Sequence, residues 1–161
     1  MHSNFLSTKS VKNIVITLLP LVALLFGACS GTHHVAKTPL EVPVFEKEQV
    51  WQLTTMRGRP ADRQSKEITL QFNSEAGSVR GIMACNTYFG HFVCNPGDPE
   101  TGRYPISITL EGSGSLGCPE ADMNADTRFY ALLPKTTHAV FTATSITLYQ
   151  NSKEILHFEL R

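Results

Sequence analysis

The sequence lacks the motifs by which many enzymes are recognised. It contains no Gly-x-Ser-x-Gly nucleophile motif, no His-Glu-x-x-His zinc motif and no glycine–lysine phosphate loop. After residue 34, histidines occur singly at His91, His138 and His157, without acidic or cysteine partners at the spacing of metal ligands. We therefore expect a protein with no catalytic site, no bound metal and no cofactor.

A glycine-rich loop has the spacing of a nucleotide-binding motif without its context. Gly112, Gly114 and Gly117 in "GSGSLG" follow the Gly-x-Gly-x-x-Gly pattern of the dinucleotide fingerprint. That fingerprint also needs a parallel strand after the helix, with an acidic residue at the end of the strand. Short alternating segments follow here instead. We interpret these glycines as giving the chain freedom to turn from a strand into a helix.

Neither sign of charge is in excess. The chain has 14 lysine and arginine residues and 14 aspartate and glutamate residues. Lys9 and Lys12 are the charged residues within positions 1–28, so the chain after that segment retains 12 basic and 14 acidic residues. Near-neutral charge argues against nucleic acid or a strongly anionic surface as the partner.

The chain also lacks an apolar run of the length that a comfortable membrane span needs, about 20 residues. Ile14–Phe26 is apolar at all but two positions, follows two lysines and is separated from Cys29 by two small residues. This order is typical of an export signal, and the cysteine resembles the lipobox of bacterial lipoproteins. We expect residues 1–28 to be a cleaved lipoprotein signal peptide. The lipid on Cys29 would then anchor the protein in the cell envelope, at the outer membrane, with the leaflet left open.

Two regions follow the signal peptide. Residues 29–47 contain prolines and small polar residues without a sustained period, so we expect the lipidated Cys29 and a flexible tether. From residue 48 onward, short segments alternate between apolar and polar residues, as in "ITLQF" and "YPISITL". This alternation is typical of antiparallel strands with one face in a core. The sequence therefore predicts one domain over residues 48–161, with about seven or eight strands.

One segment of this domain has a helical period. Phe129, Leu132 and Leu133 have the i, i+3, i+4 spacing of a helix face. Acidic residues precede them, as suits a helix N-terminus, and Pro134 should end the helix after Leu133. We expect a mainly β, α+β fold: an antiparallel barrel or half-barrel with one helix covering an opening or a face.

Three cysteines lie beyond Cys29: Cys85, Cys94 and Cys118. An exported chain meets oxidising conditions in many envelopes, and three thiols allow three alternative single bridges. No pair has the Cys-x-x-Cys redox spacing, and none of the three has a neighbouring base in the sequence. Thiol catalysis, with Cys94 as a spare nucleophile, is therefore a minor hypothesis.

Residues 48–161 resemble the META-domain family, also described as HslJ-like. The resemblance rests on "WQL" at Trp51, on "ITLQF", on the Cys-Asn element "ACNTYFG" and on "LGCPEADMNADTRFYALL", in which a Cys-Pro pair leads into the helix. Ala84, the stretch "SLGC", Cys94 and the loop "NPGDPETG" depart from the family pattern.

The resemblance implies a lipocalin-like barrel with one helix and a disulfide between Cys85 and Cys118. Closing a loop of about 30 residues would contribute roughly 3–4 kcal/mol in the chain-entropy model. With this disulfide, we expect Asn86 to have a structural role, because asparagine tolerates the left-handed conformation and can form hydrogen bonds to nearby backbone. The candidate surface or structural residues of the two elements are Asn86, Tyr88, Gly90 and Pro119.

Family members are commonly secreted or lipid-anchored bacterial proteins without established enzymatic activity, which implies a stress- or envelope-related module. We expect a non-enzymatic envelope lipoprotein that binds another envelope protein or a cell-wall component. An exposed aromatic patch would be the sign of such a module, and ordinary barrel core is the other interpretation of these residues. The candidate residues are Tyr88, Phe89, Phe92 and Tyr104.

The alternative function is a carrier or sensor of a small apolar ligand. A barrel of about eight strands is either filled by side chains or able to hold one small ligand. Phe72, Phe141 and Phe158 would line such a cavity or fill it. A solidly packed interior would contradict this alternative.

Overall fold

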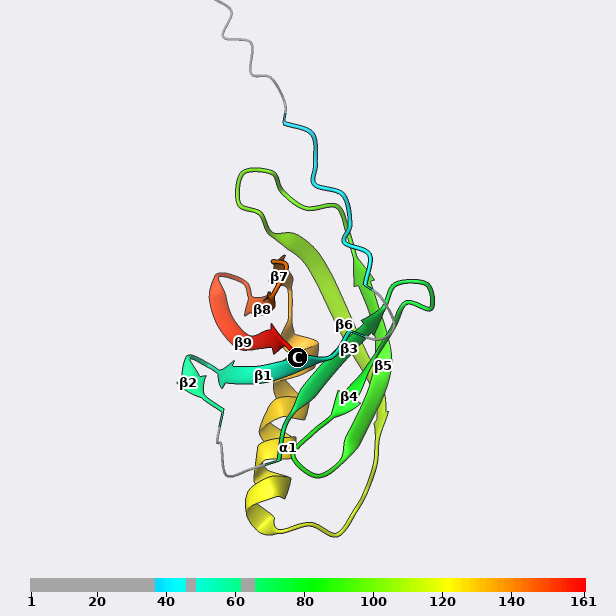
Figure 1. Ribbon diagram of the computed structural model, residues 1–161, viewed down its shortest axis with the longest axis vertical. Coiled ribbons are helices and arrows are strands. Elements are labelled where there is room, and N and C mark those ends of the chain that lie inside the picture. The colour runs from blue at the N-terminus through cyan, green and yellow to red at the C-terminus, as the bar shows by residue number, and fades with distance from the viewer. Residues whose placement is uncertain (1–36, 46–48, 62–65) are drawn as a thin grey trace, which may run out of the picture. The chain divides into compact units, whose positions relative to one another are not determined.

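Within the residues that the structure describes, eight antiparallel strands close into a barrel (Figure 1). The structure is a computed structural model that describes residues 37–45, 49–61 and 66–161. The strands pair in the order β1-β3-β4-β5-β6-β7-β8-β9, and β9 pairs with β1 to close the ring. They are β1 (Trp51–Met56), β3 (Thr69–Asn73), β4 (Ser78–Ile82), β5 (Thr87–Cys94), β6 (Tyr104–Ser113), β7 (His138–Phe141), β8 (Ser145–Gln150) and β9 (Lys153–Leu160). The predicted lipocalin-like barrel is confirmed.

The predicted helix is also confirmed. Helix α1 (Glu120–Leu132) connects β6 to β7 and continues into a short 3-10 helix, η1 (Leu133–Lys135). Pro119 precedes α1 with extended backbone, and Pro134 lies in η1, where its missing N–H does not interrupt α-helical bonding. Figure 1 shows α1 at one end of the ring of strands. No described helix has the length and apolar character needed to cross a membrane.

Helix α1 fills the barrel interior from this end. Phe129 is fully buried, with its ring 5.3 Å from that of Tyr88 and 6.4 Å from that of Phe158. The alternation seen in the sequence places the inward residues of the strands around it. In β5, for example, Tyr88, Gly90 and Phe92 are buried while the residues between them are exposed. The helical period and the period of two therefore converge on one core.

A second aromatic cluster fills the rest of the interior. The ring of Phe72 lies 5.1 Å from that of Phe45 and 4.6 Å from that of Phe92, and Phe45 also contacts Phe141 at 4.9 Å. Phe45 is 6% exposed, and its backbone N–H donates to Ser74 Oγ at 2.8 Å. The folded domain therefore begins before the predicted boundary at residue 48, because an aromatic residue of the predicted tether packs in the core.

The β1–β2 hairpin shapes the surface beside α1. Strand β1 pairs with β3 over two residues only, and its later residues pair with the short strand β2 (Arg59–Pro60). The turn between β1 and β2 is Arg57-Gly58, and both residues have positive φ, 51° and 72°. Two-residue hairpin turns of this handedness match the twist of the strands. The Leu53 N–H donates to the carbonyl of Ile68, just before β3, at 2.8 Å, and the cleft described below lies beside these residues.

Candidate functional site

The Cys85–Cys118 disulfide is present, as the family resemblance implied. It joins the connection between β4 and β5 to the residue before Pro119, across a sequence separation of 33 and a Cα–Cα distance of 6.3 Å. Both cysteines are half-buried. A loop of that length is worth roughly 3–4 kcal/mol in the chain-entropy model. The bridge therefore ties the start of α1 to the barrel.

A buried carboxylate on α1 reinforces the same tie. Asp126 is 6% exposed, and its Oδ1 accepts a hydrogen bond from the Cys85 N–H at 3.1 Å. Its Oδ2 accepts from the backbone N–H of Asn86 at 3.0 Å and from Asn86 Nδ2 at 2.9 Å. Three donors thus compensate for the burial of this charge. The sequence analysis read the acidic residues here as suited to a helix N-terminus and missed this role for Asp126.

Asn86 joins distant parts of the fold and does not have the left-handed backbone that was expected of it, since the described non-glycine residues with positive φ are Arg57 and Asn151. Its Oδ1 accepts the backbone N–H of Leu116 at 2.7 Å, in the loop after β6. Its amide nitrogen donates to Asp126 at 2.9 Å, so one side chain joins the loop to α1. Both ends of the amide are occupied. Asn86 is therefore part of the fold's framework.

Tyr88 lies in the core. It is 1% exposed, and its hydroxyl donates to the Thr69 carbonyl at 2.8 Å. Gly81 lies opposite Tyr88 on β4, and a Cβ at Gly81 would collide with the Thr69 carbonyl and approach the Tyr88 hydroxyl to 2.8 Å. Burial raises the pKa of Tyr88 well above its ordinary value. Gly81 thus leaves room for the Tyr88 ring and its hydrogen bond inside the barrel, so Tyr88 serves the packing of the core.

Local structure explains why glycine occurs at position 90 and proline at position 119. A Cβ at Gly90 would collide with the Thr109 carbonyl of β6, where the β5–β6 register shifts, so only glycine allows this close approach. Pro119 is exposed and immediately precedes α1, and its carbonyl accepts the N–H of Asp122 at 3.0 Å.

The four aromatics considered as a surface patch do not gather on one face. Phe92 is buried, and Tyr104 is half-buried with its ring 5.3 Å from that of Phe141. Phe89 is 54% exposed and lies over Gly112, its partner on β6. Tyr88 and Phe92 therefore belong to the barrel interior, whereas Phe89 and Tyr104 do not belong to the buried core.

Cys94 cannot compete for the disulfide in this fold. It lies at the far end of β5 from Cys85, and a strand rises about 3.3 Å per residue. Partial burial raises the pKa of the Cys94 thiol to about 11. Most of the thiol is therefore protonated at neutral pH, which disfavours the hypothesis that Cys94 is a nucleophile.

The histidines lie on separate parts of the barrel. His91 Nε2 is 3.0 Å from Glu111 Oε1 on the exposed face of β5 and β6. His157 Nδ1 is 2.8 Å from the Thr147 hydroxyl, between β9 and β8. His138 Nδ1 is 3.0 Å from the Thr137 hydroxyl. Among the described residues, no three His, Cys, Asp or Glu side chains are placed to hold a metal ion.

A cleft of about 880 Å³ lies beside these elements. The β1–β2 hairpin, the segment leading into β3, α1 and the start of β9 form its walls. Five exposed cationic side chains line it, and we call this site the basic cleft. They are Arg57, Arg59, Lys66, Arg128 and Lys153.

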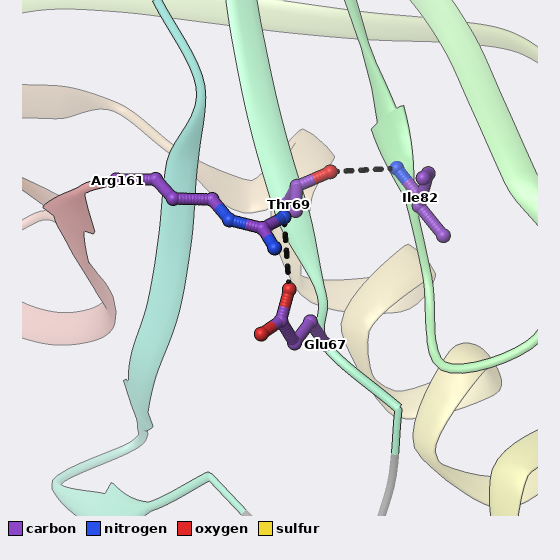
Figure 2. A network of polar contacts seen from close by, with 4 residues as sticks. All are labelled: Glu67, Thr69, Ile82 and Arg161. Carbon is purple, nitrogen blue, oxygen red and sulfur yellow. Dashed lines mark hydrogen bonds and ion pairs between the residues drawn. The ribbon is translucent and has the colours of Figure 1, made fainter.

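Glu67 is the one carboxylate that lines the basic cleft among residues 37–45, 49–61 and 66–161. Figure 2 shows the guanidinium of Arg161 directed toward it, and the distance from Arg161 Nη1 to Glu67 Oε2 is 3.0 Å. The backbone N–H of Arg161 also donates to the Val50 carbonyl at 3.0 Å. In the same view, the Thr69 hydroxyl accepts the N–H of Ile82 at 3.0 Å, which ties β3 to β4 behind the ion pair. Glu67 is therefore already paired with Arg161, a cation that is not among the five lining the cleft.

The five cations are left without such partners in the described part of the chain. None of their side chains makes a hydrogen bond or an ion pair with residues 37–45, 49–61 or 66–161. The floor between them includes the buried side chains of Leu53, Ile68 and Ala125. A rim of positive charge around a partly apolar floor suits a small anionic ligand.

The sequence pattern did not predict this cleft, because its cations come from segments spread between residues 57 and 153. The total charge is balanced, and nothing in the local patterns places Arg128 of α1 near the β1–β2 hairpin. The one sequence signal was "RGRP", in which two arginines flank the turn glycine Gly58. The balanced total charge therefore does not describe this face of the protein.

Comparisons with known proteins assign the chain to a family. The model of the META domain matches residues 44–161, so the chain belongs to the META-domain family. The match begins next to Phe45, in accord with the place of that residue in the core. No protein with a curated description matches the chain.

Two similar solved structures were both determined by NMR. One is 20% identical, covers 71% of this chain and 90% of its own, and has a TM-score of 0.48. The other, a protein from Burkholderia xenovorans, is 19% identical, covers 80% of this chain and 97% of its own, and has a TM-score of 0.47.

Proposed function

We propose that this META-domain protein is a non-enzymatic module of the bacterial cell envelope that is anchored through a lipid on Cys29 and binds its partner at the basic cleft. The observation that carries the binding proposal is the cleft itself, with five cationic side chains around about 880 Å³. The support for the anchor is the order of lysines, apolar segment and small residues before Cys29, which lies outside the described residues.

A binding role fits the chemistry of the described side chains better than catalysis does. The described groups able to act as nucleophile or base lie away from the cleft lining: Cys94 ends β5, Asp126 is buried with three donors, and the hydroxyl–histidine pairs Thr147–His157 and Thr137–His138 do not line the cleft. A nucleophile needs a base within hydrogen-bonding reach. This separation supports a module that recognises an envelope component and does not transform it.

The alternative carrier function has less support. Phe72 and Phe158 are almost fully buried, and the two aromatic clusters occupy the barrel interior. An interior site would require these rings to move apart, at the expense of their packing. The open cleft outside the barrel requires no such rearrangement.

Intact mass and fractionation of the chain expressed in a bacterial host test the anchor. We expect a chain that begins at Cys29, carries acyl mass and sediments with membranes, while a Cys29→Ala variant is neither acylated nor cleaved at that point. Recovery of the wild-type chain with an unmodified Cys29 would overturn the anchor.

A stress- or envelope-related role is the remaining part of the proposal. Loss of the protein should sensitise a host cell to envelope stress, and wild-type protein should restore growth. A variant with Arg57, Arg128 and Lys153 replaced by glutamine should fail to restore it at equal abundance. Full restoration by that variant would separate the physiological role from the cleft.

A further inference from the structure

The charges of the basic cleft indicate the chemistry of its ligand, and the inference rests on the cleft's proposed binding role. We propose that the basic cleft binds a multiply charged phosphate-bearing ligand. This chemistry is shared by soluble phosphorylated molecules and by the phosphate head groups of anionic lipids.

The first argument is the imbalance of charge. Among the described lining residues, five cations face one carboxylate, and Arg161 Nη1 lies 3.0 Å from Oε2 of that carboxylate. Like charges around one cleft repel each other, and the repulsion is stronger where protein walls exclude water. A ligand with several negative charges replaces this repulsion with attraction, whereas a singly charged ligand leaves most of it in place.

The second argument is the type of cation. Three of the five are arginines, from the β1–β2 hairpin and from α1. A guanidinium presents its donors in a planar fork that matches two oxygens of a phosphate group, and a lysine ammonium adds a compact point charge. A cleft of about 880 Å³ lies within the range for small-molecule sites and exceeds what one inorganic phosphate fills.

The third argument is the backbone of Arg57. Among the described residues, Arg57 and Asn151 are the non-glycine residues with positive φ, at 51° and 56°. Asparagine tolerates this conformation, as expected for the turn between β8 and β9, whereas arginine is unfavourable there. The β1–β2 hairpin thus keeps an arginine at the cleft where glycine or asparagine would suit the backbone better.

Calorimetric titration of the full-length chain in a non-ionic detergent tests the proposal, with inorganic pyrophosphate as the probe. We expect saturable binding that weakens several-fold between about 50 mM and about 200 mM salt, because ions screen exposed charges. The cleft variant carries Arg57→Gln, Arg128→Gln and Lys153→Gln, and we expect its affinity to fall by at least about tenfold.

A control variant separates the cleft from total charge. It carries Lys37→Gln, Arg80→Gln and Lys135→Gln, three exposed cations outside the cleft, and it has the same net charge as the cleft variant. We expect its affinity to stay within about twofold of wild type. Equal losses in both variants, or no binding of pyrophosphate to wild type, would overturn the proposal.

A competition experiment distinguishes the two sources of phosphate. Detergent micelles doped with cardiolipin, whose head group carries two phosphates, should displace pyrophosphate if the ligand is a lipid head group, with phosphatidylcholine micelles as the control. Retained pyrophosphate binding in both micelles supports a soluble ligand. Acylation of Cys29 is measured separately, so absence of anion binding with an intact anchor would reject the phosphate ligand and leave the anchored module in place.

Discussion

Helix α1 contributes to two regions that differ in their charged residues: one contains a buried, hydrogen-bonded charge and the other contains exposed charges. On one side, Asp126 is buried and accepts three hydrogen bonds from the Cys85-Asn86 segment. Two positions later, Arg128 is exposed in the basic cleft without a described partner. Residues two apart lie about 200° apart around a helix, so the same turn supplies both regions. A charge whose hydrogen bonds are satisfied inside the fold contributes to stability, whereas a charge left in an open cleft is available to a ligand.

The disulfide lies on the side of α1 that contains Asp126 and not on the side of the basic cleft. Cys85 and Cys118 close the buried side, where Asn86 and Asp126 already join the loop, the barrel and the helix. On the cleft side, backbone hydrogen bonds join the walls, from the Leu53 N–H to the Ile68 carbonyl and from the Arg57 N–H to the Ile155 carbonyl, and the ion pair of Glu67 and Arg161 is exposed. Exposed pairs contribute little stability. The buried side should therefore respond to mutation through stability, and the cleft side through binding.

The largest expected loss of stability is from Asp126→Ala. The change leaves three buried or half-buried donors without their acceptor, which should cost about 3–5 kcal/mol. For a domain of this size, that is a fall in Tm of about 12–20 °C. Thermal unfolding measures it, with Asp122→Ala in the first turn of α1 as control, which should cost about 1 kcal/mol or less through the helix dipole. Similar losses from the two variants would contradict the role of Asp126.

Loss of the disulfide should have the next largest effect. Cys118→Ser should lower the free energy of unfolding by roughly 3–4 kcal/mol, because the unfolded chain regains the freedom of the open loop. Urea unfolding with and without reductant measures this, and the reductant should affect wild type and not the variant. Since Cys85 also donates to Asp126, the double variant with Asp126→Ala should depart from additivity by about 0.5 kcal/mol or more.

The third cysteine provides a test of pH dependence. The pKa of Cys94 is raised to about 11, so its reactive thiolate should be scarce at neutral pH and increase as the pH rises toward 11. Alkylation of Cys94 should be at least about tenfold slower at pH 8 in the folded chain than in urea, with the disulfide kept oxidised. Equal rates would show that partial burial does not protect this thiol.

A smaller effect of opposite sign is expected at the cleft. Arg57→Asn should stabilise the protein by about 0.5–1 kcal/mol, because asparagine tolerates positive φ better than arginine does. The same change should weaken pyrophosphate binding, since a cleft cation is removed. The reciprocal variant Asn151→Arg should destabilise the β8–β9 turn by a similar amount and leave binding unchanged. A loss of stability in Arg57→Asn would mean that the arginine side chain supports the fold.

The smallest effects on stability should come from the other cleft cations. Arg128→Gln and Lys153→Gln should each change the free energy of unfolding by no more than about 0.5 kcal/mol, because both side chains are exposed and make no described polar contact. Their unfolding curves should overlay that of wild type while their pyrophosphate affinities differ. A large destabilisation by either change would remove the contrast between the two sides of α1.

The sequence by itself determined the class of fold and the disulfide's place. Period-two segments and the spacing of Phe129, Leu132 and Leu133 depend only on local backbone geometry, so the strands and the helix could be read directly. The Cys-Asn and Cys-Pro elements carried the family resemblance, which supplied the Cys85–Cys118 pairing. Local pattern and family motif thus sufficed for the barrel, its helix and its covalent tie.

Tertiary structure alone decided which charges are buried, which are exposed and which gather. Asp126 reads like any acidic residue near a helix start until the Cys85-Asn86 segment meets it. Phe45 reads as part of a tether until the barrel packs around it. The basic cleft unites cations between residues 57 and 153 only when the ring of strands closes and α1 covers its end. Electrostatic interaction depends on distance in space, and that distance is fixed by the closure of the barrel rather than by spacing along the chain.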